Sequence, residues 1–195
     1  GVARTLTVNA LTGATSNAQT LSGVITTAGT GNQLIKQGLG ILALTGLNAG
    51  TLDLSGSQGY QILNGVLQIN GANGNDASLG VAPASAVADN ILLNGGVFSA
   101  TTTSVVLNVN RGITVGASGG VLDVATAGTA LAIPGAIAGT GPLTKTGAGQ
   151  LSLLGASTFS GALNVAAGTL TTLYLADAAL TTLPADSPAD VSFDA

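Results

Sequence analysis

Two carboxylates stand in matching contexts, Asp53 within TLDL (51–54) and Asp123 within VLDV (121–124). Paired carboxyl groups about 5–10 Å apart cleave glycosidic bonds, so these residues raise a carbohydrate-active β-helical enzyme, a lyase or hydrolase, as one interpretation. The chain has no His and no Trp, and all eight of its acidic residues are Asp. With coils of about 20 residues, the two carboxylates would lie about three coils apart, too far to act together. We therefore predict solvated Asp side chains and no catalytic residues.

The four cations of the chain recur as pairs, Arg4 with Arg111 and Lys36 with Lys145. One interpretation is a row of side chains that contact a ligand along the molecule. The other, which we favour, is that each repeat uses one Arg and one Lys to satisfy carbonyl groups at strand ends or a nearby Asp, or to stay soluble. Eight Asp against four cations, a net charge of −4, leave no basic stripe for phosphates, so nucleic acid is not an expected partner.

Metal and cofactor chemistry has little support in the sequence. Asp76 and Asp89 flank the segment 75–89, but the dense run of oxygen ligands that calcium requires is missing. The chain has no Cys, which excludes disulfides and thiolate metal sites. The Gly-x-Gly pairs at 38–40 and 147–149 are followed by no phosphate-loop pattern and are predicted to be turns. We expect neither a metal nor a cofactor.

A repeated phrase dominates the organisation of the chain. It occupies residues 29–46 and 139–155, with the shared skeleton K-x-G-x-G-x-L-x-L-x-G. The repeat-defining residues are Lys36, Gly38, Gly40, Leu42, Leu44 and Gly46 in the first copy, and Lys145, Gly147, Gly149, Leu151, Leu153 and Gly155 in the second. Self-similarity at long period is typical of arrays whose units bury their apolar faces against their neighbours.

Short alternating runs predict strands throughout. Examples are ILAL (41–44), TLDL (51–54), NILLN (90–94) and LNV (163–165), short runs punctuated by Gly and Asn. Asn-Gly steps such as Asn64-Gly65 supply corners with positive φ. The expected excursions from strand structure, short helical or irregular segments, are residues 75–89, which would protrude as a loop, and residues 175–183.

The pattern favours a right-handed parallel β-helix over a β-sandwich. A sandwich does not repeat itself at an interval of about 110 residues, and it usually has aromatic core residues, whereas only 3% of this chain is aromatic. Coils of about 20 residues divide the chain into nine or ten turns.

Composition agrees with a thin aliphatic core. Hydrophobic residues make up 46% of the chain, 30 residues are Gly and only 6% are charged. No apolar run approaches the roughly 18 residues of a membrane-spanning helix, so no transmembrane segment is expected. The opening GVARTL is not a targeting signal, and we expect a piece of a longer protein.

The second copy and its surroundings resemble a known family. Residues 139–170 combine LTK (143–145), an aromatic-Ser-Gly step (159–161) and a V-x-x-GTL strand (165–170). This succession closely resembles the autotransporter-associated β-strand repeat, found in the passenger regions of type V secreted bacterial surface proteins. Residues 107–124 are similar to the stretch that precedes this block in the same family.

The resemblance implies a structural or adhesive, extracellular rod or filament on a bacterial surface, associated with the outer membrane. We expect residues 1–172 to form the β-helix and residues 173–195, which depart from the pattern, to be a cap or linker. Open β-helix ends make self-association, head-to-tail or lateral, an expected property. An unidentified surface receptor or glycan is the other partner that the resemblance implies.

Overall fold

The computed structural model describes residues 3–7, 18–29, 31–71, 75–101, 104–172, 180–182 and 190–193; side chains are described for 19–29, 31–71, 75–101 and 104–172. Within these ranges the regular structure is β-strand, apart from one short 3-10 helix, η2 (Ala77–Leu79). The described helix is far too short to span a membrane.

Three parallel sheets form the faces of the molecule. The first sheet contains, in order, β1 (Ala3–Thr7), β3 (Gln33–Gln37), β5 (Tyr60–Ile62), β7 (Val87–Leu93), β10 (Arg111–Val115) and β13 (Ile137–Gly139). The second contains β2 (Ala18–Leu21), β4 (Ile41–Leu44), β6 (Val66–Ile69), β8 (Val97–Ala100), β11 (Gly120–Val124), β14 (Leu143–Thr146), β16 (Leu163–Val165) and β18 (Leu180–Thr182). The third contains β9 (Val105–Val106), β12 (Ala130–Ile133), β15 (Gln150–Leu153), β17 (Thr169–Thr172) and β19 (Asp190–Phe193).

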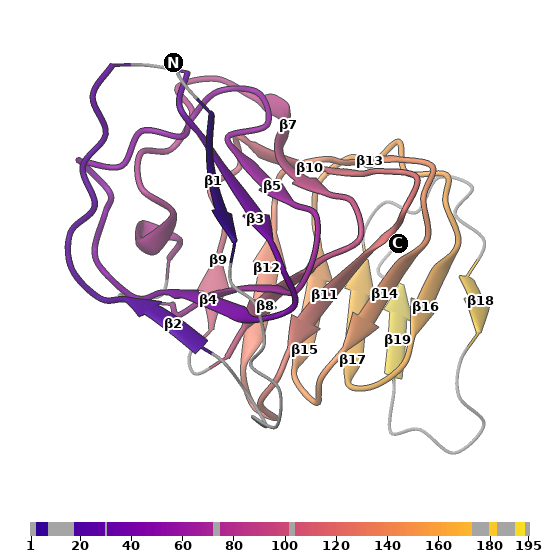
Figure 1. Ribbon diagram of the computed structural model, residues 1–195. Coiled ribbons are helices and arrows are strands. Elements are labelled where there is room, and N and C mark those ends of the chain that lie inside the picture. The colour runs from indigo at the N-terminus through magenta and orange to yellow at the C-terminus, as the bar shows by residue number, and fades with distance from the viewer. Residues whose placement is uncertain are drawn as a thin grey trace.

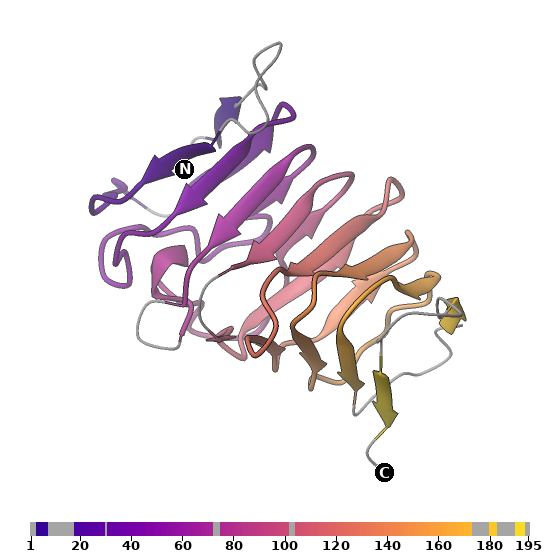
Figure 2. The ribbon, with the colours of Figure 1, turned by 90° about the horizontal axis from the view of Figure 1, so that it is seen from below.

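Successive coils run from sheet to sheet in a constant order and lie beside one another; the third sheet begins at β9 and the first sheet ends at β13. Strand β10, for example, is followed by β11 in the second sheet and β12 in the third, and β13 then returns to the first sheet. Figures 1 and 2 show the resulting stack, with colour advancing steadily from the indigo N-terminal coils to the yellow C-terminal strands. The expected all-β parallel solenoid is confirmed, while the hand of its winding stays a prediction.

Aliphatic ladders fill the interior. Every second side chain of a strand points inward, and in-register pairing stacks these side chains from coil to coil. In the second sheet Leu42, Leu67, Phe98 and Leu122 form one such ladder, and none of the four is exposed. The third sheet stacks Val105, Leu131, Leu151 and Leu170 in the same way. A thin core of this kind needs few aromatic side chains, in agreement with the composition.

The expected number of coils, nine or ten, is not confirmed, because the longest sheet stacks eight strands. The expectation assumed a uniform coil of about 20 residues. Coil length in fact varies: Leu143 pairs with Leu163, 20 residues further along the chain, whereas Val66 pairs with Val97, 31 residues further along. The longer coils reduce the number of turns that the chain can make.

The predicted strands agree with the structure to different degrees. Residues 41–44 and 163–165 form strands with the predicted bounds, and 90–94 falls largely within the longer β7. The predicted strand at 51–54 is wrong, because this segment is irregular. Leu52 and Leu54 are nevertheless buried, so the alternation correctly indicated which side chains face the core.

The excursion predicted at 75–89 takes a different form. Its short helical part is present as η2, but Ala77, Ser78 and Leu79 are buried rather than protruding. They occupy the stretch of the coil that follows β6, where later coils place a strand of the third sheet. Of the segment 175–183, the structure describes only 180–182, which is strand β18 and not a helix; the remainder lies outside the described residues.

Candidate functional site

The first repeat copy closes a corner around a buried ammonium group. Lys36 lies on β3 at an inward-facing position, in a ladder with Ile62 and Leu93, and its side chain has no exposed surface. Its Nζ donates hydrogen bonds to the carbonyl oxygens of Gln37, the last residue of β3, at 3.0 Å and of Gly38 at 2.7 Å. A third bond reaches the carbonyl of Asn64 in the next coil at 3.1 Å.

The second copy builds the same arrangement. Lys145 on β14 is fully buried, and its Nζ donates to the carbonyls of Thr146 at 2.6 Å and Gly147 at 2.8 Å. Its third bond reaches the carbonyl of Ala167 in the next coil at 3.1 Å. Each lysine therefore donates to three backbone carbonyls at a corner and links two successive coils. These contacts are consistent with the structural interpretation of the lysine pair, which stays a prediction.

Glycines allow the backbone to approach the lysine Nζ closely at these corners. Gly38 and Gly147, two residues after each lysine, both have φ +76, a conformation that L side chains rarely adopt. Gly65 and Gly168, from the coil above, also have positive φ, and a Cβ on either would lie 2.7–2.9 Å from the lysine Nζ. The skeleton K-x-G-x-G thus encodes an ammonium group surrounded by backbone.

The remaining repeat positions serve packing between coils. Leu42, Leu44, Leu151 and Leu153 are buried in the core cluster. Gly46 and Gly155 end their copies, and a Cβ on either would collide with a carbonyl oxygen of the preceding coil, that of Gly23 or Gly135 respectively. Gly40 and Gly149 are buried at the start of the strand that carries the leucines. None of these residues presents a reactive group at the surface.

The two copies occupy different corners of the solenoid. The first runs from the first sheet to the second, since Lys36 lies on β3 and Leu42 on β4. The second runs from the second sheet to the third, since Lys145 lies on β14 and Leu151 on β15. The repeat is therefore displaced by one face of the solenoid, and its two copies do not form a row on one side.

Burial changes the titration of both lysines. Desolvation lowers the pKa of Lys145 from 10.5 to about 8, an effect that the carboxylate of Asp123 partly opposes. Burial also lowers the pKa of Lys36 from its ordinary value. An amine with a lowered pKa can act as a base or nucleophile, but these two are enclosed by backbone and cannot meet a substrate.

Arg111 anchors a second buried polar cluster. Its Nε donates to Oδ2 of Asp76 at 2.7 Å, and its Nη1 donates to Oδ1 of Asn90 at 2.9 Å. Its Nη2 donates to backbone carbonyls in the segment that follows η2, including those of Gly80 and Val81 at 3.0 Å each. The guanidinium lies 5.9 Å from the ring centre of Tyr60, whose hydroxyl donates to the carbonyl of Leu79.

This cluster fixes η2 against the neighbouring coils. The carboxylate of Asp76 pairs with Arg111 and accepts from the backbone N–H of Asn108 at 3.0 Å. The side chain of Arg4 lies outside the described part of the structure, so its equivalence to Arg111 stays a prediction. No group of three or more potential metal ligands occurs among the residues that the structure describes.

Two buried asparagines were missed by sequence reasoning. The Nδ2 of Asn90 donates to the carbonyls of Leu54 and Gly56 at 2.8 Å each, and Asn48 bridges Ile25 N–H and the carbonyl of Ser78. Both residues are fully buried. An Asn directly before an apolar run, as in Asn90-Ile91, is a weak signal for such an amide clamp, because the same residue type also marks exposed turns.

The candidate catalytic carboxylates do not come together. Asp53 lies in the irregular part of the coil after β4, where its Oδ1 accepts from the hydroxyl of Ser55 at 2.6 Å. Asp123 lies three coils further on, on the outer face of β11, and accepts from the hydroxyls of Ser99 at 2.7 Å and Thr146 at 2.9 Å. Each carboxylate is held by neighbouring hydroxyl groups, and the two do not form an acid–base pair with each other.

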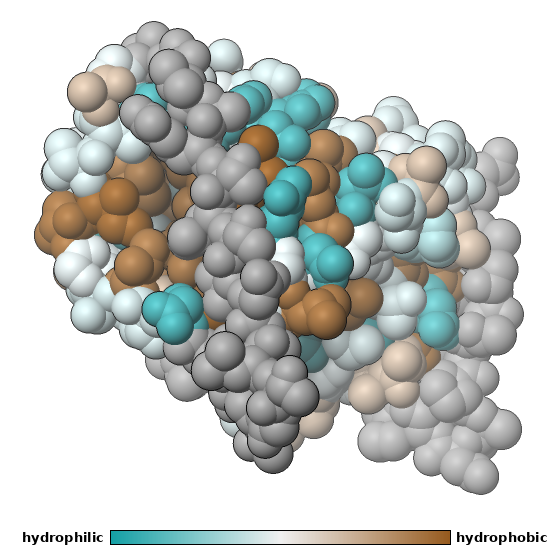
Figure 3. Space-filling model, in the orientation of Figure 1, coloured by the Kyte–Doolittle hydropathy of each residue, from teal (hydrophilic) through white to brown (hydrophobic). Residues whose placement is uncertain are grey.

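The described surface therefore has an unusual charge distribution. All three cations with described side chains, Lys36, Arg111 and Lys145, are buried, whereas Asp53, Asp89 and Asp123 are partly exposed. Figure 3 shows a face on which apolar and polar residues are interspersed. Large exposed apolar side chains on the N-terminal coils include Val24, Leu39 and Leu47, exposed by 63%, 69% and 52%. Such a surface attracts no anions and offers apolar contact area.

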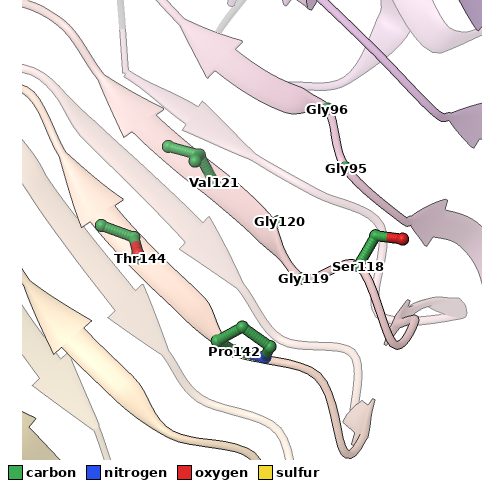
Figure 4. A pocket seen from close by; sticks show the side chains of 8 residues that line it. All are labelled: Gly95, Gly96, Ser118, Gly119, Gly120, Val121, Pro142 and Thr144. Carbon is green, nitrogen blue, oxygen red and sulfur yellow. The ribbon is translucent and has the colours of Figure 1, made fainter.

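A shallow groove of about 190 Å³ crosses the corner between the first and second sheets (Figure 4). Its floor contains Gly95, Gly96, Gly119 and Gly120, and Val121 is among its other lining residues. The glycines have a packing reason, since a Cβ on Gly120 would lie 2.7 Å from Cβ of Leu93 and one on Gly96 would lie 2.5 Å from Ile62 Cγ2. No titratable side chain lines the groove, so none of its lining residues can act as a general acid or base.

Comparison with known proteins identifies the repeat family that the two motif copies match. Residues 34–49 and 143–171 match the family described as passenger-associated-transport-repeat. A curated relative, the adhesin BmaC autotransporter of Brucella suis biovar 1 (strain 1330), is 36% identical over 160 residues. The match covers 82% of this chain and 4% of that relative, so the chain spans a small part of its length. No solved structure matches the chain.

Proposed function

The two motif copies are passenger-associated transport repeats, the repeat of autotransporter passenger regions, and from this premise we propose that the chain is an adhesive, structural segment of an extracellular bacterial surface rod. The proposal rests on one observation: the residues that define the repeat form the corners of the solenoid and pack its successive coils together. Lys36 and Lys145 bind backbone carbonyls of two successive coils, so the repeat contributes to length and rigidity.

A parallel solenoid suits presentation at a distance from the cell. Each coil adds about 4.8 Å along the axis, and hydrogen bonds between coils make the body stiff in that direction. The outer faces carry short polar and aliphatic side chains with few charges, which suits contact with other surfaces. The relative is named an adhesin, and we extend that role to this chain as part of the proposal.

The segment is proposed to have no enzymatic activity. Asp53 and Asp123 each bond to neighbouring hydroxyl groups, and Lys36 and Lys145 are enclosed by backbone. A panel of polysaccharides incubated with the purified chain is expected to yield no products. Turnover that disappears in Asp53→Ala or Asp123→Ala would replace this proposal with a carbohydrate-active enzyme.

Self-association through the ends is a subsidiary part of the proposal. The outer edge of β2 at one end leaves backbone groups without a partner strand among the described residues. At the other end, β18 and β19 extend the second and third sheets, and we propose that residues 173–195 as a whole cap or continue the rod there. Sedimentation of the chain at high concentration is expected to reveal oligomers, and monodisperse monomers would contradict the association.

The function is tested best in the parent protein on intact cells. Deleting residues 1–172 in frame is expected to shorten the surface rod seen by electron microscopy and to reduce attachment of the cells to host cells or glycans. An antibody against this segment should bind intact cells before the deletion and not after it. Unchanged rod length and attachment, or an epitope reached only after lysis, would contradict the proposal.

A further inference from the structure

The corner next to Lys36 contains an Asn-Gly step in an unusual setting. The N–H of Gly65 donates to Oδ1 of Asn64, the preceding side chain, at 2.8 Å. The Gly65 nitrogen therefore lies beside the amide whose Cγ it would attack to form a five-membered ring. The Asn64 side chain is exposed, so water reaches it, while the flanking N–H groups of Leu63 and Val66 are bonded to Lys36 and Gly40 of the previous coil.

The Lys36 ammonium polarises the peptide group between Asn64 and Gly65. The carbonyl oxygen of Asn64 belongs to the peptide unit that contains the Gly65 nitrogen, and it accepts a hydrogen bond from Lys36 Nζ at 3.1 Å. Loss of the Gly65 proton places negative charge on this oxygen, where an ammonium group in a water-poor corner stabilises it. Lys36 is thereby a positioning residue that makes the Gly65 nitrogen a better nucleophile.

From this geometry we infer that Asn64-Gly65 is a site of self-modification, in which Asn64 is converted to isoaspartate. The deprotonated Gly65 nitrogen attacks Cγ of Asn64, a C–N bond forms, the Cγ–Nδ2 bond breaks and ammonia leaves with the proton. Water then adds to one carbonyl of the resulting succinimide and breaks its bond to the ring nitrogen. The net reaction exchanges an amide and water for a carboxylate and ammonium, with no change in oxidation state.

The position of Lys36 selects the product. Opening of the ring at Cγ gives aspartate, whereas opening at the former main-chain carbonyl gives isoaspartate and converts that carbonyl into a free carboxylate. The Lys36 ammonium already bonds to this oxygen, so it stabilises the charge that develops there. The product supplies a counter-charge to a buried cation that has only carbonyl partners among the described residues. Isoaspartate is therefore the favoured outcome.

Two other corners of the chain provide internal comparisons. In the Asn94-Gly95 step, the N–H of Gly95 is bonded to the carbonyl of Gly119 in the next coil at 2.7 Å, and Asn94 Oδ1 accepts from Ser118 N–H. That nucleophile is engaged elsewhere, so Asn94 should persist. At the equivalent lysine corner, Ala167 occupies the position of Asn64 and accepts from Lys145, so the corner itself does not require an Asn.

The experiment follows deamidation in the folded chain at about pH 7.5 and pH 8.5, with peptide mapping for a mass gain of about 1 Da and fragmentation that distinguishes isoaspartate from aspartate. Conversion at Asn64 is expected to be at least tenfold faster than at Asn94, to accelerate at the higher pH and to give mainly isoaspartate. In urea the two sites should become similar in rate. Equal rates at Asn64 and Asn94 in the folded chain would overturn the inference.

Variants test the role of the corner. At about pH 7.5, where Lys145 is mostly charged, Ala167→Asn is expected to create a second reactive site beside it. Asn64→Gln should abolish the reaction at residue 64. Lys36→Gln should slow conversion of Asn64 and lower its proportion of isoaspartate to that of the urea-unfolded chain. Should Lys36→Gln fail to fold, Ala167→Asn decides: a residue 167 that converts no faster than Asn94 contradicts the proposed part of the lysine.

Discussion

Leu42 and Lys145 occupy the same inward-facing ladder of the second sheet, four coils apart. The ladder passes from Leu42 through Leu67, Phe98 and Leu122 to Lys145. Within the repeat phrase, however, the equivalent of Lys145 is Lys36, which stacks on Ile62 in the first sheet. The phrase therefore specifies a corner wherever it occurs, and it is not tied to one face of the solenoid.

Removing a corner lysine is expected to destabilise the fold. Lys145→Met leaves the carbonyls of Thr146, Gly147 and Ala167 without their donor, and although it also removes a buried charge, we expect a net loss of about 1–3 kcal/mol. Urea denaturation measures the change in the free energy of unfolding. The exposed Gln37→Ala on β3 is the control, expected within about 0.5 kcal/mol of the parent. Equal midpoints for Lys145→Met and the parent would refute the capping role.

The stability of the chain should rise between about pH 8 and pH 10. The folded pKa of Lys145, about 8, lies below its unfolded value of 10.5, so over this interval the unfolded chain binds more protons and folding gains free energy as pH rises. Lys36 acts in the same direction. Burial raises the pKa of Tyr60, so stability should fall again above about pH 10. Urea midpoints across this range should rise less steeply in Lys145→Met, and identical slopes would contradict the assignment.

Asp76→Asn should cost more than any substitution of an exposed carboxylate. It leaves the buried guanidinium of Arg111 without a counter-charge, for which we expect a loss of about 3–5 kcal/mol. Asp89→Asn, at a partly exposed residue that accepts from the hydroxyl of Ser57, is the matched control and should change stability by less than about 1 kcal/mol. Thermal unfolding followed by circular dichroism compares them. Similar melting temperatures for the two variants would argue against a stabilising cluster.

The glycine that ends each repeat copy is predicted to be required by packing. Gly46→Ala places a Cβ against the carbonyl of Gly23, and Gly155→Ala does the same at Gly135, so each should destabilise the fold by about 1–3 kcal/mol. A Cβ on Gly50 meets nothing within 4 Å, so Gly50→Ala should be neutral or slightly stabilising. If Gly50→Ala lowered the denaturation midpoint as much as Gly46→Ala and Gly155→Ala do, this account would be contradicted.

The local sequence pattern was sufficient to predict the fold class and to predict which individual side chains are buried. The alternation in ILAL placed Leu42 and Leu44 in the core, and Leu52 and Leu54 were assigned correctly even though no strand forms there. The number of coils could not be predicted, because insertions such as the segment around η2 lengthen a coil without disturbing the pattern of its strands.

The polar interior was only partly predictable. Repetition indicated a structural role for the lysines, and the structure adds the carbonyls that they bind. The partnership of Asp76, Asn90 and Arg111 joins residues up to 35 positions apart, and no periodicity encodes such a contact. The displacement of the repeat by one face was also hidden, because it depends on the lengths of all the coils between the two copies.

Distance measurement between spin labels tests the central claim, a parallel solenoid in which the second repeat is displaced by one face. The chain has no cysteine, so pairs of cysteines can be labelled selectively. Ile41 and Thr144 share an outward ladder four rungs apart, with a backbone separation of about 19 Å, whereas Ile35 and Thr144 are equivalent in the phrase but lie on different sheets. The account predicts a shorter distance for Ile41→Cys with Thr144→Cys than for Ile35→Cys with Thr144→Cys. The reverse order would place the two copies on one face and contradict it.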